Sequence, residues 1–144
     1  MKFLKLAILL FLIAVTVPTV SAQTTQPAYS TSGSVSANSP ALLSPKLFKK
    51  QFKKAKNKVL IDVRTPKEFA EGHLKKAQNI DYQGDNFEEQ IGKLDKSKTY
   101  YLYCRSGKRT IGAAEVMQKT GFENIVVLEG GLLAWKEQRL PVKK

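Results

Sequence analysis

The residue with the clearest chemistry is Cys104, the only cysteine in the 144-residue sequence. The residues after it are polar, small or cationic, and they include Lys108 and Arg109. Neighbouring cations favour the thiolate, which is the nucleophilic form of cysteine. One cysteine cannot form an internal disulfide, so Cys104 is a reactive thiol, an intermolecular partner or an inert buried side chain. Its cationic neighbours favour the reactive thiol.

The residues around Cys104 predict a strand, a tight loop and a helix. Residues 99–103 are mostly aromatic and apolar, which is typical of a buried strand, and a helical pattern follows Arg109. Loop N–H groups and a helix N-terminus converge at such a junction, and both stabilise anions. The sequence therefore predicts a sulfur nucleophile held in an anion-binding loop.

Strand and helix patterns alternate along the rest of the chain after residue 44. The expected strands are residues 59–63, 77–80, 99–103 and 125–128. Helices are expected to begin at Pro45, after a capping box at Thr65 and Glu68, at Phe87 and at Ile111. A tight turn at Gly130 and Gly131 is expected to lead into a last helix near Leu132. This alternation predicts an α/β fold, a doubly wound parallel sheet with helices on both faces. Ligands bind beyond the C-terminal strand ends of such sheets, where Cys104 is expected.

The N-terminal region is expected to lie outside the folded domain. Residues 1–22 have early lysines, an apolar core and small residues before Ala22, as in a signal peptide cleaved there. The alternative is an uncleaved anchor, for which the apolar segment is short. Residues 23–44 are expected to be a flexible Ser/Thr/Pro-rich linker, and residues 45–144 a single domain. We therefore expect a periplasmic or secreted protein without stable membrane insertion after cleavage.

The sequence is strongly basic, with a formal net charge of +12. Export argues against a nucleic-acid partner, which leaves either a solvated lysine-rich surface or the attraction of a small anionic substrate. One cysteine and one histidine are too few for a typical metal site. The sequence also has no glycine-rich dinucleotide motif. We therefore expect no cofactor, no metal and a monomeric chain.

Three ordered blocks of sequence resemble the rhodanese-like sulfurtransferases. The first block is 60–64 with 68–69 and 72–74, the second is 104–109, and the third is 128–131 with Trp135 and 140–142. Together these blocks extend over most of residues 45–142. The resemblance implies a single rhodanese-like domain and an active-site loop at the second block.

The resemblance also implies a reaction. Cys104 would attack the outer sulfur of thiosulfate or a similar donor, keep that sulfur as a persulfide, and pass it to cyanide or a thiol. The residues implied to bind the substrate are Arg105, Ser106, Gly107, Lys108 and Arg109. Arg105 and Lys108 are expected at the entrance. Arg109 either binds donor oxygens or braces the loop, and Ser106 either donates a hydrogen bond to sulfur or is simply a small loop residue.

Two other functions remain open from the sequence. One is a sulfur carrier or partner-binding module without turnover. The other is a phosphatase of the related cysteine-loop type, although Arg109 follows Cys104 after four residues, whereas those phosphatases have five. Asp62 and Arg64 are expected to form buried ion pairs or hydrogen bonds beneath the loop, and His73 is expected to be a scaffold residue rather than a base.

Overall fold

The computed structural model describes residues 39–144. The predicted signal peptide and all but the last few residues of the predicted linker lie outside the described residues.

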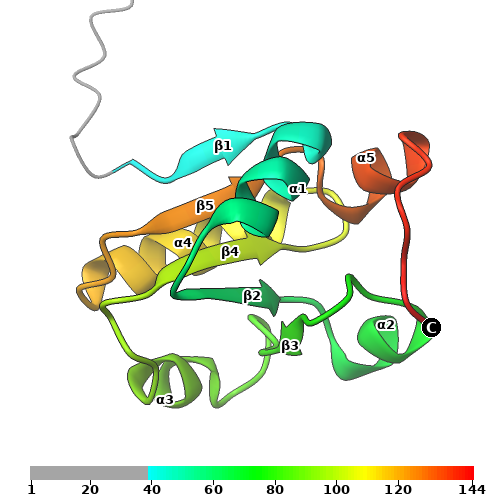
Figure 1. The fold of residues 1–144 in the computed structure, drawn as a ribbon. Coiled ribbons are helices and arrows are strands. Elements are labelled where there is room, and N and C mark those ends of the chain that lie inside the picture. The colour runs from blue at the N-terminus through cyan, green and yellow to red at the C-terminus, as the bar shows by residue number, and fades with distance from the viewer. Residues whose placement is uncertain (1–38) are drawn as a thin grey trace, which may run out of the picture. The chain divides into compact units, whose positions relative to one another are not determined.

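Five parallel strands form one sheet in the order β1-β5-β4-β2-β3 (Figure 1). The strands are β1 (Ala41–Leu43), β2 (Lys58–Asp62), β3 (Gln78–Asn79), β4 (Thr99–Tyr103) and β5 (Ile125–Leu128). Because all strands run the same way, their C-terminal ends lie side by side along one edge of the sheet, which we call its C-terminal edge. Figure 1 shows α2 (Pro66–Glu71) and α5 (Gly131–Glu137) beyond these strand ends. The central position of β4 brings the residue that follows it to the middle of this edge.

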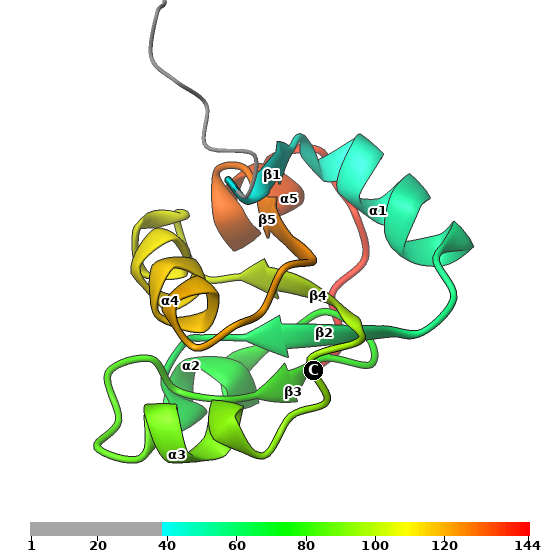
Figure 2. The ribbon, with the colours of Figure 1, turned by 90° about the vertical axis from the view of Figure 1, so that its left-hand side faces the viewer.

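Helices cover both faces of the sheet, as the alternating pattern predicted. Figure 2 shows α1 (Pro45–Lys54) and α4 (Lys108–Lys119) on opposite sides. One apolar cluster lies under α4 and α3 (Phe87–Gly92), and the other lies under α1 and α5. Successive side chains of β4 point to opposite faces, so Tyr101 and Tyr103 join the α1 side while Leu102 joins the α4 side.

The start of α2 follows the predicted capping box. The Thr65 hydroxyl accepts a hydrogen bond from the Glu68 N–H, and the Glu68 carboxylate accepts one from the Thr65 N–H. Pro66 occupies the first helical turn, where its missing N–H is harmless. Ser44 precedes Pro45 in α1 in the same way, but its side chain makes no capping hydrogen bond.

Two boundaries differ from those expected. Residues 41–43 form β1 and pair with β5, although the linker was expected to extend through residue 44. This edge strand has a largely exposed pattern, and its partner lies far along the chain, so no local signal marks it. The helix expected from Ile111 begins at Lys108 instead, directly after Gly107. Within residues 39–144, none of the helices combines the length and the apolar character needed to cross a membrane.

Candidate functional site

Cys104 lies where the sequence predicted, directly after the central strand β4 at the C-terminal edge of the sheet. The Val63 N–H donates to the Tyr103 carbonyl at 2.9 Å, which holds this strand end against the chain leaving β2. Alternation along β4 turns Cys104 toward the α3 and α4 side. The residue is only 1% exposed, so the thiol lies beneath the loop and not on its surface.

The loop of residues 105–107 turns the chain from β4 into α4. The Gly107 N–H donates to Cys104 Sγ at 3.1 Å, and among the described residues it is the one donor to this sulfur. Gly107 has a φ of 99°, which glycine adopts without steric penalty. Since α4 begins at the next residue, the positive end of its dipole lies beside the sulfur. The strand, loop and helix that the sequence predicted are thus present, with one loop amide bonded to the sulfur.

The N-terminus of α5 holds the other side of the loop. The Leu132 N–H donates to the Cys104 carbonyl at 2.8 Å, and the Leu133 N–H donates to the Arg105 carbonyl at 3.0 Å. This approach requires glycine at position 131, because a Cβ there would lie 2.6 Å from the Cys104 carbonyl oxygen. Gly131 also has a φ of 58°. The predicted tight turn at Gly130 and Gly131 therefore also positions the loop.

Charged side chains lie beside the loop that follows Cys104. Arg105, Ser106 and Lys108 are exposed, while Gly107 and Arg109 are half-buried. A pocket of about 350 Å³ lies beside Arg105. Its charged lining residues are Arg64, Glu68, Glu71, Arg105 and Lys136. Three cations and two carboxylates thus line the space next to the loop, and an anion there would contact cationic side chains.

Arg109 braces the site. Its guanidinium donates two hydrogen bonds to the Glu68 carboxylate, at 2.6 and 2.8 Å. The hydrogen bonds from Arg109 lower the pKa of Glu68 to about 2, and the same contact raises the pKa of Arg109. The pair joins the first turn of α4 to the first turn of α2. Of the two roles left open for Arg109, this contact supports bracing.

Asp62 and Arg64 form the buried ion pair that the sequence predicted. The Asp62 carboxylate accepts from Arg64 Nε at 2.9 and 3.0 Å and from Nη2 at 2.6 Å. Arg64 Nη2 also donates to the Gly72 carbonyl at 2.8 Å. Burial alone would lower the pKa of Arg64, but the hydrogen bonds and charge of Asp62 raise it. The pair ties the end of β2 to the end of α2.

His73 has the scaffold position expected of it. Its ring stacks on Phe69 with centroids 3.9 Å apart, and Nδ1 lies 3.0 Å from the Phe69 carbonyl oxygen. Its backbone exchanges two hydrogen bonds with Lys143. Within residues 39–144, no three His, Cys, Asp or Glu side chains gather in a way that could hold a metal ion.

Thr110 is a candidate site residue that the sequence analysis did not identify. It lies in the first turn of α4, it is fully buried, and its hydroxyl has no hydrogen-bond partner among the described residues. A sequence signal for its burial exists, since Ala113, Ala114 and Met117 follow at helical spacing and are all buried. The amide contacts from α5 had no such signal, because they depend on where α5 packs.

Comparisons with known proteins identify a family and several relatives. Residues 44–138 match the family described as Rhodanese-like domain. The chain is 40% identical over 82 residues to the putative sulfurtransferase YtwF of Bacillus subtilis, which covers 57% of this chain and 77% of YtwF. This chain is also 40% identical over 82 residues to the probable adenylyltransferase/sulfurtransferase MoeZ of Mycobacterium tuberculosis. The match covers 57% of this chain but only 21% of MoeZ.

A solved structure shows the same fold. The rhodanese-related protein of Thermoplasma volcanium superposes with a TM-score of 0.63 at 27% identity, over 72% of this chain and 97% of that one. The family match includes every helix from α1 to α5. The chain therefore belongs to the rhodanese-like domain family.

Proposed function

We propose that this protein transfers sulfane sulfur from thiosulfate or a similar anionic donor to cyanide or a thiol through a persulfide on Cys104. The observation that carries the proposal is the Gly107 N–H bonded to Cys104 Sγ at the start of α4, at the C-terminal edge of the sheet. The amide and the helix dipole stabilise negative charge on sulfur, both as thiolate and as persulfide.

The reaction has two displacements. The Cys104 thiolate attacks the outer sulfur of thiosulfate, a new S–S bond forms, the old S–S bond breaks, and sulfite leaves with the electron pair. The acceptor then attacks the outer persulfide sulfur, takes that sulfur atom, and leaves the Cys104 thiolate behind. Cyanide becomes thiocyanate in this second step. Because the first product leaves before the acceptor reacts, we expect ping-pong kinetics.

The loop residues have separate roles in this proposal. The exposed Arg105 and Lys108 attract the anionic donor, and Ser106 and Gly107 shape the loop over the sulfur. Arg109 holds the loop in place through Glu68. The donor and the acceptor are small molecules, so the proposal needs neither a cofactor nor a metal.

The test is thiocyanate formation by the purified protein supplied with thiosulfate and cyanide. We expect turnover by the natural protein and none by Cys104→Ser, which keeps nearly the same volume without a sulfur nucleophile. A matched control is Ser106→Ala in the same exposed loop, which should retain activity if Ser106 only shapes the loop. Turnover that survives Cys104→Ser would overturn the persulfide mechanism.

The burial of Cys104 favours a second candidate, a sulfur carrier or partner-binding module without turnover. A thiol in a residue that is 1% exposed is less open to a second small molecule than a surface thiol. Mass spectrometry after incubation with thiosulfate distinguishes the two functions. A carrier keeps one added sulfur atom in the presence of cyanide, whereas the enzyme loses it. Phosphatase activity has less support, because Arg109 is engaged by Glu68.

We further propose that the protein acts after export, as a monomer in the periplasm or outside the cell. The proposal rests on the signal-like residues 1–22. Cell fractionation with an antibody, together with the N-terminal sequence of the recovered protein, tests it. A protein in the cytoplasmic fraction that retains residues 1–22 would contradict it.

A further inference from the structure

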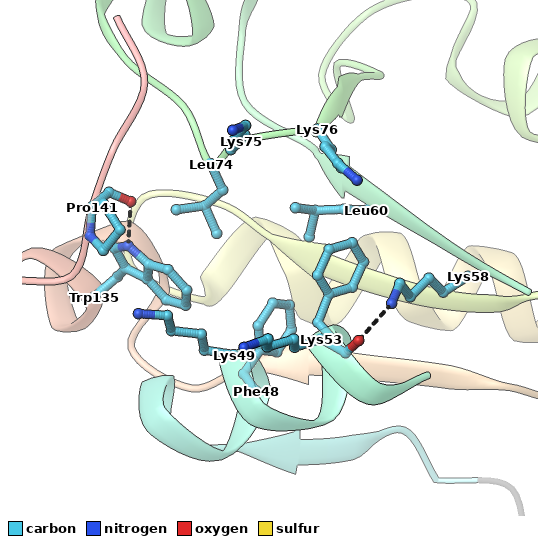
Figure 3. A pocket seen from close by; sticks show the side chains of 11 residues that line it. Phe48, Lys49, Lys53, Lys58, Leu60, Leu74, Lys75, Lys76, Trp135 and Pro141 are labelled. Carbon is cyan, nitrogen blue, oxygen red and sulfur yellow. Dashed lines mark hydrogen bonds between the residues drawn. The ribbon is translucent and has the colours of Figure 1, made fainter. Parts of the chain in front are cut away.

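A second cavity lies on the opposite face of the sheet from Cys104, and it combines an apolar floor with a rim of lysines (Figure 3). It has a volume of about 320 Å³. Its apolar lining residues are Phe48, Phe52, Leu60, Leu74, Trp135 and Pro141. The cationic lining residues are Lys49, Lys53, Lys58, Lys75 and Lys76. Neither Cys104 nor any residue of its loop lines this cavity, so it is distinct from the site described above.

The floor is apolar, and its one side-chain donor, the Trp135 indole N–H, is already bonded. Phe48, Leu60, Leu74 and Trp135 are each at most 6% exposed. The Phe48 ring packs edge-to-face against Trp135, with ring centroids 6.5 Å apart. The indole N–H of Trp135 donates to the Pro141 carbonyl at 3.1 Å, so the floor already satisfies this donor. The apolar surface still open to a ligand lies mainly on the half-buried Phe52, the exposed Pro141 and the lysine stems, and a ligand body there gains by burying it.

The rim has one sign of charge. No Asp or Glu lines the cavity, and within residues 39–144 none of the five lysines forms an ion pair. Lys58 donates to the Lys53 carbonyl and lies over the Phe52 ring, which leaves its positive charge without a counter-ion. Lys49 and Lys53 stand four residues apart on α1, where like charges disfavour an isolated helix. The cavity therefore has a positively charged rim and, among the described residues, no lining carboxylate to balance it.

From this combination, we propose that the cavity binds a small organic anion with one apolar body, aromatic or short acyl, and one carboxylate, sulfonate or phosphate group. The apolar body would lie over the floor against Phe52 and Pro141, and the charged group would face the lysine rim. The volume suits one small molecule, since ligand cavities begin at about 300 Å³. An inorganic anion would make no apolar contact with the floor, and a neutral apolar molecule would make no charge contact with the lysines.

The heat of binding reports occupancy without an optical signal, which matters because a naphthalene ring absorbs and emits in the range of Trp135. The experiment titrates the full-length protein with naphthalenesulfonate in a calorimeter. We expect saturable binding of this probe at moderate salt. Inorganic sulfate lacks the apolar body and naphthylmethyl-trimethylammonium has the opposite charge, so neither should bind comparably. Equal binding of either control would overturn the proposal.

Helix α1 offers a matched pair of variants. Lys49→Gln with Lys53→Gln removes two charges from the rim, and we expect the affinity for naphthalenesulfonate to fall by about tenfold. Lys50→Gln with Lys54→Gln removes the same charge from the same helix at residues that do not line the cavity, and it should change the affinity little. An equal loss of affinity in both variants would mean that the probe is attracted by the overall positive charge, and it would contradict a specific site in the cavity.

The other occupants are outcomes of the same test. Binding to phosphatidylglycerol vesicles without binding to free naphthalenesulfonate would mean that the lysines contact a membrane surface, and it would overturn the small-molecule site. Sulfur transfer from thiosulfate to cyanide should be unchanged in the Lys49→Gln, Lys53→Gln variant, because these residues lie outside the Cys104 loop. A negative result for anion binding in the cavity would therefore leave the sulfur-transfer proposal unaffected, and the reverse also holds.

Discussion

At the scale of single residues, the site depends on backbone geometry as much as on the thiol. Gly107 turns its N–H toward Cys104 Sγ from a left-handed conformation. Gly131 lets the chain before α5 approach the carbonyls of Cys104 and Arg105. Neither glycine has a side chain that could take part in the reaction. Their contribution is to allow two segments of backbone to meet closely enough to fix the position of the sulfur.

Gly131→Ala tests this backbone contact. An alanine Cβ would lie 2.6 to 2.7 Å from backbone atoms of Cys104 and Arg105, and the φ of 58° is itself unfavourable for alanine by about 1–2 kcal/mol. We expect a lower free energy of unfolding and, because the loop must shift, a loss of thiocyanate formation of about tenfold or more. Urea denaturation and the turnover assay measure the two effects.

Gly92→Ala is the control for this change. Gly92 ends α3 with no atom within 4 Å of the added methyl group, so both measurements should stay near those of the natural protein. Full activity in Gly131→Ala would show that the loop tolerates displacement, and it would contradict the role given to α5.

At the scale of elements, the ion pair between Glu68 and Arg109 connects α2 and α4. Glu68 belongs to the capping box of α2 and also accepts both hydrogen bonds from Arg109 in α4. One carboxylate therefore satisfies a helix N-terminus and anchors the helix that follows the Cys104 loop. Loss of this carboxylate should weaken both contacts together.

Glu68→Gln should therefore destabilise the protein in a pH-dependent way. In the folded protein, the hydrogen bonds that Arg109 donates to Glu68 lower the pKa of this carboxyl to about 2, from an ordinary value of 4.5. Its stabilisation is thus complete above about pH 4.5 and is lost as the pH falls toward 2. We expect Glu68→Gln to lower the free energy of unfolding by about 1.5–3 kcal/mol at pH 7.

Chemical denaturation from pH 7 down to about pH 2 measures this difference, which should shrink as the pH falls. Glu89→Gln is the control, because the Glu89–Lys93 pair is about two-thirds exposed and should contribute only a few tenths of a kcal/mol. A difference between Glu68→Gln and the natural protein that stays constant with pH would contradict the Arg109 contact as its cause.

At the scale of the whole described domain, residues 39–144 have two candidate sites on opposite faces of one sheet. Cys104 lies on the face of α3 and α4, and the lysine-rimmed cavity lies on the face of α1 and α5. Helix α5 contributes to both, since its first amides hold the Cys104 loop while Trp135 lines the cavity. The basic sequence thus presents two separate groups of cations.

The exposed cations around Cys104 should affect substrate capture more than chemistry. We expect Arg105→Gln with Lys108→Gln to raise the KM for thiosulfate several-fold and to change kcat less, because the donor is a dianion attracted by a positive field. Added salt should also raise the KM of the natural protein. The Debye screening length falls to about 10 Å at an ionic strength of 0.1 M, so the cations attract the donor over a shorter distance.

Steady-state kinetics at two salt concentrations measure these effects. Lys50→Gln with Lys54→Gln, which removes the same charge from α1, should leave the KM nearly unchanged. A KM that responds to neither the loop variant nor salt would mean that the loop cations do not attract the donor.

Local patterns in the sequence were sufficient for most of the fold. The strand at residues 99–103, the capping box at Thr65 and Glu68, and the turn at Gly130 and Gly131 each appear in the structure where they were expected. Such features depend on residues a few positions apart, so a single sequence contains their full signal. The prediction of Cys104 at a strand end had the same origin. The strand β1 was missed because its only partner, β5, lies more than eighty residues away.

The sequence by itself determined the strand–loop–helix setting of Cys104 and the α/β class, because short-range spacing encodes both. Only the tertiary structure decided that Arg109 reaches Glu68, that α5 amides hold the loop, and that five lysines surround one apolar floor. Each of these contacts joins residues that are distant in the chain, and their meeting depends on the packing of helices against both faces of the sheet.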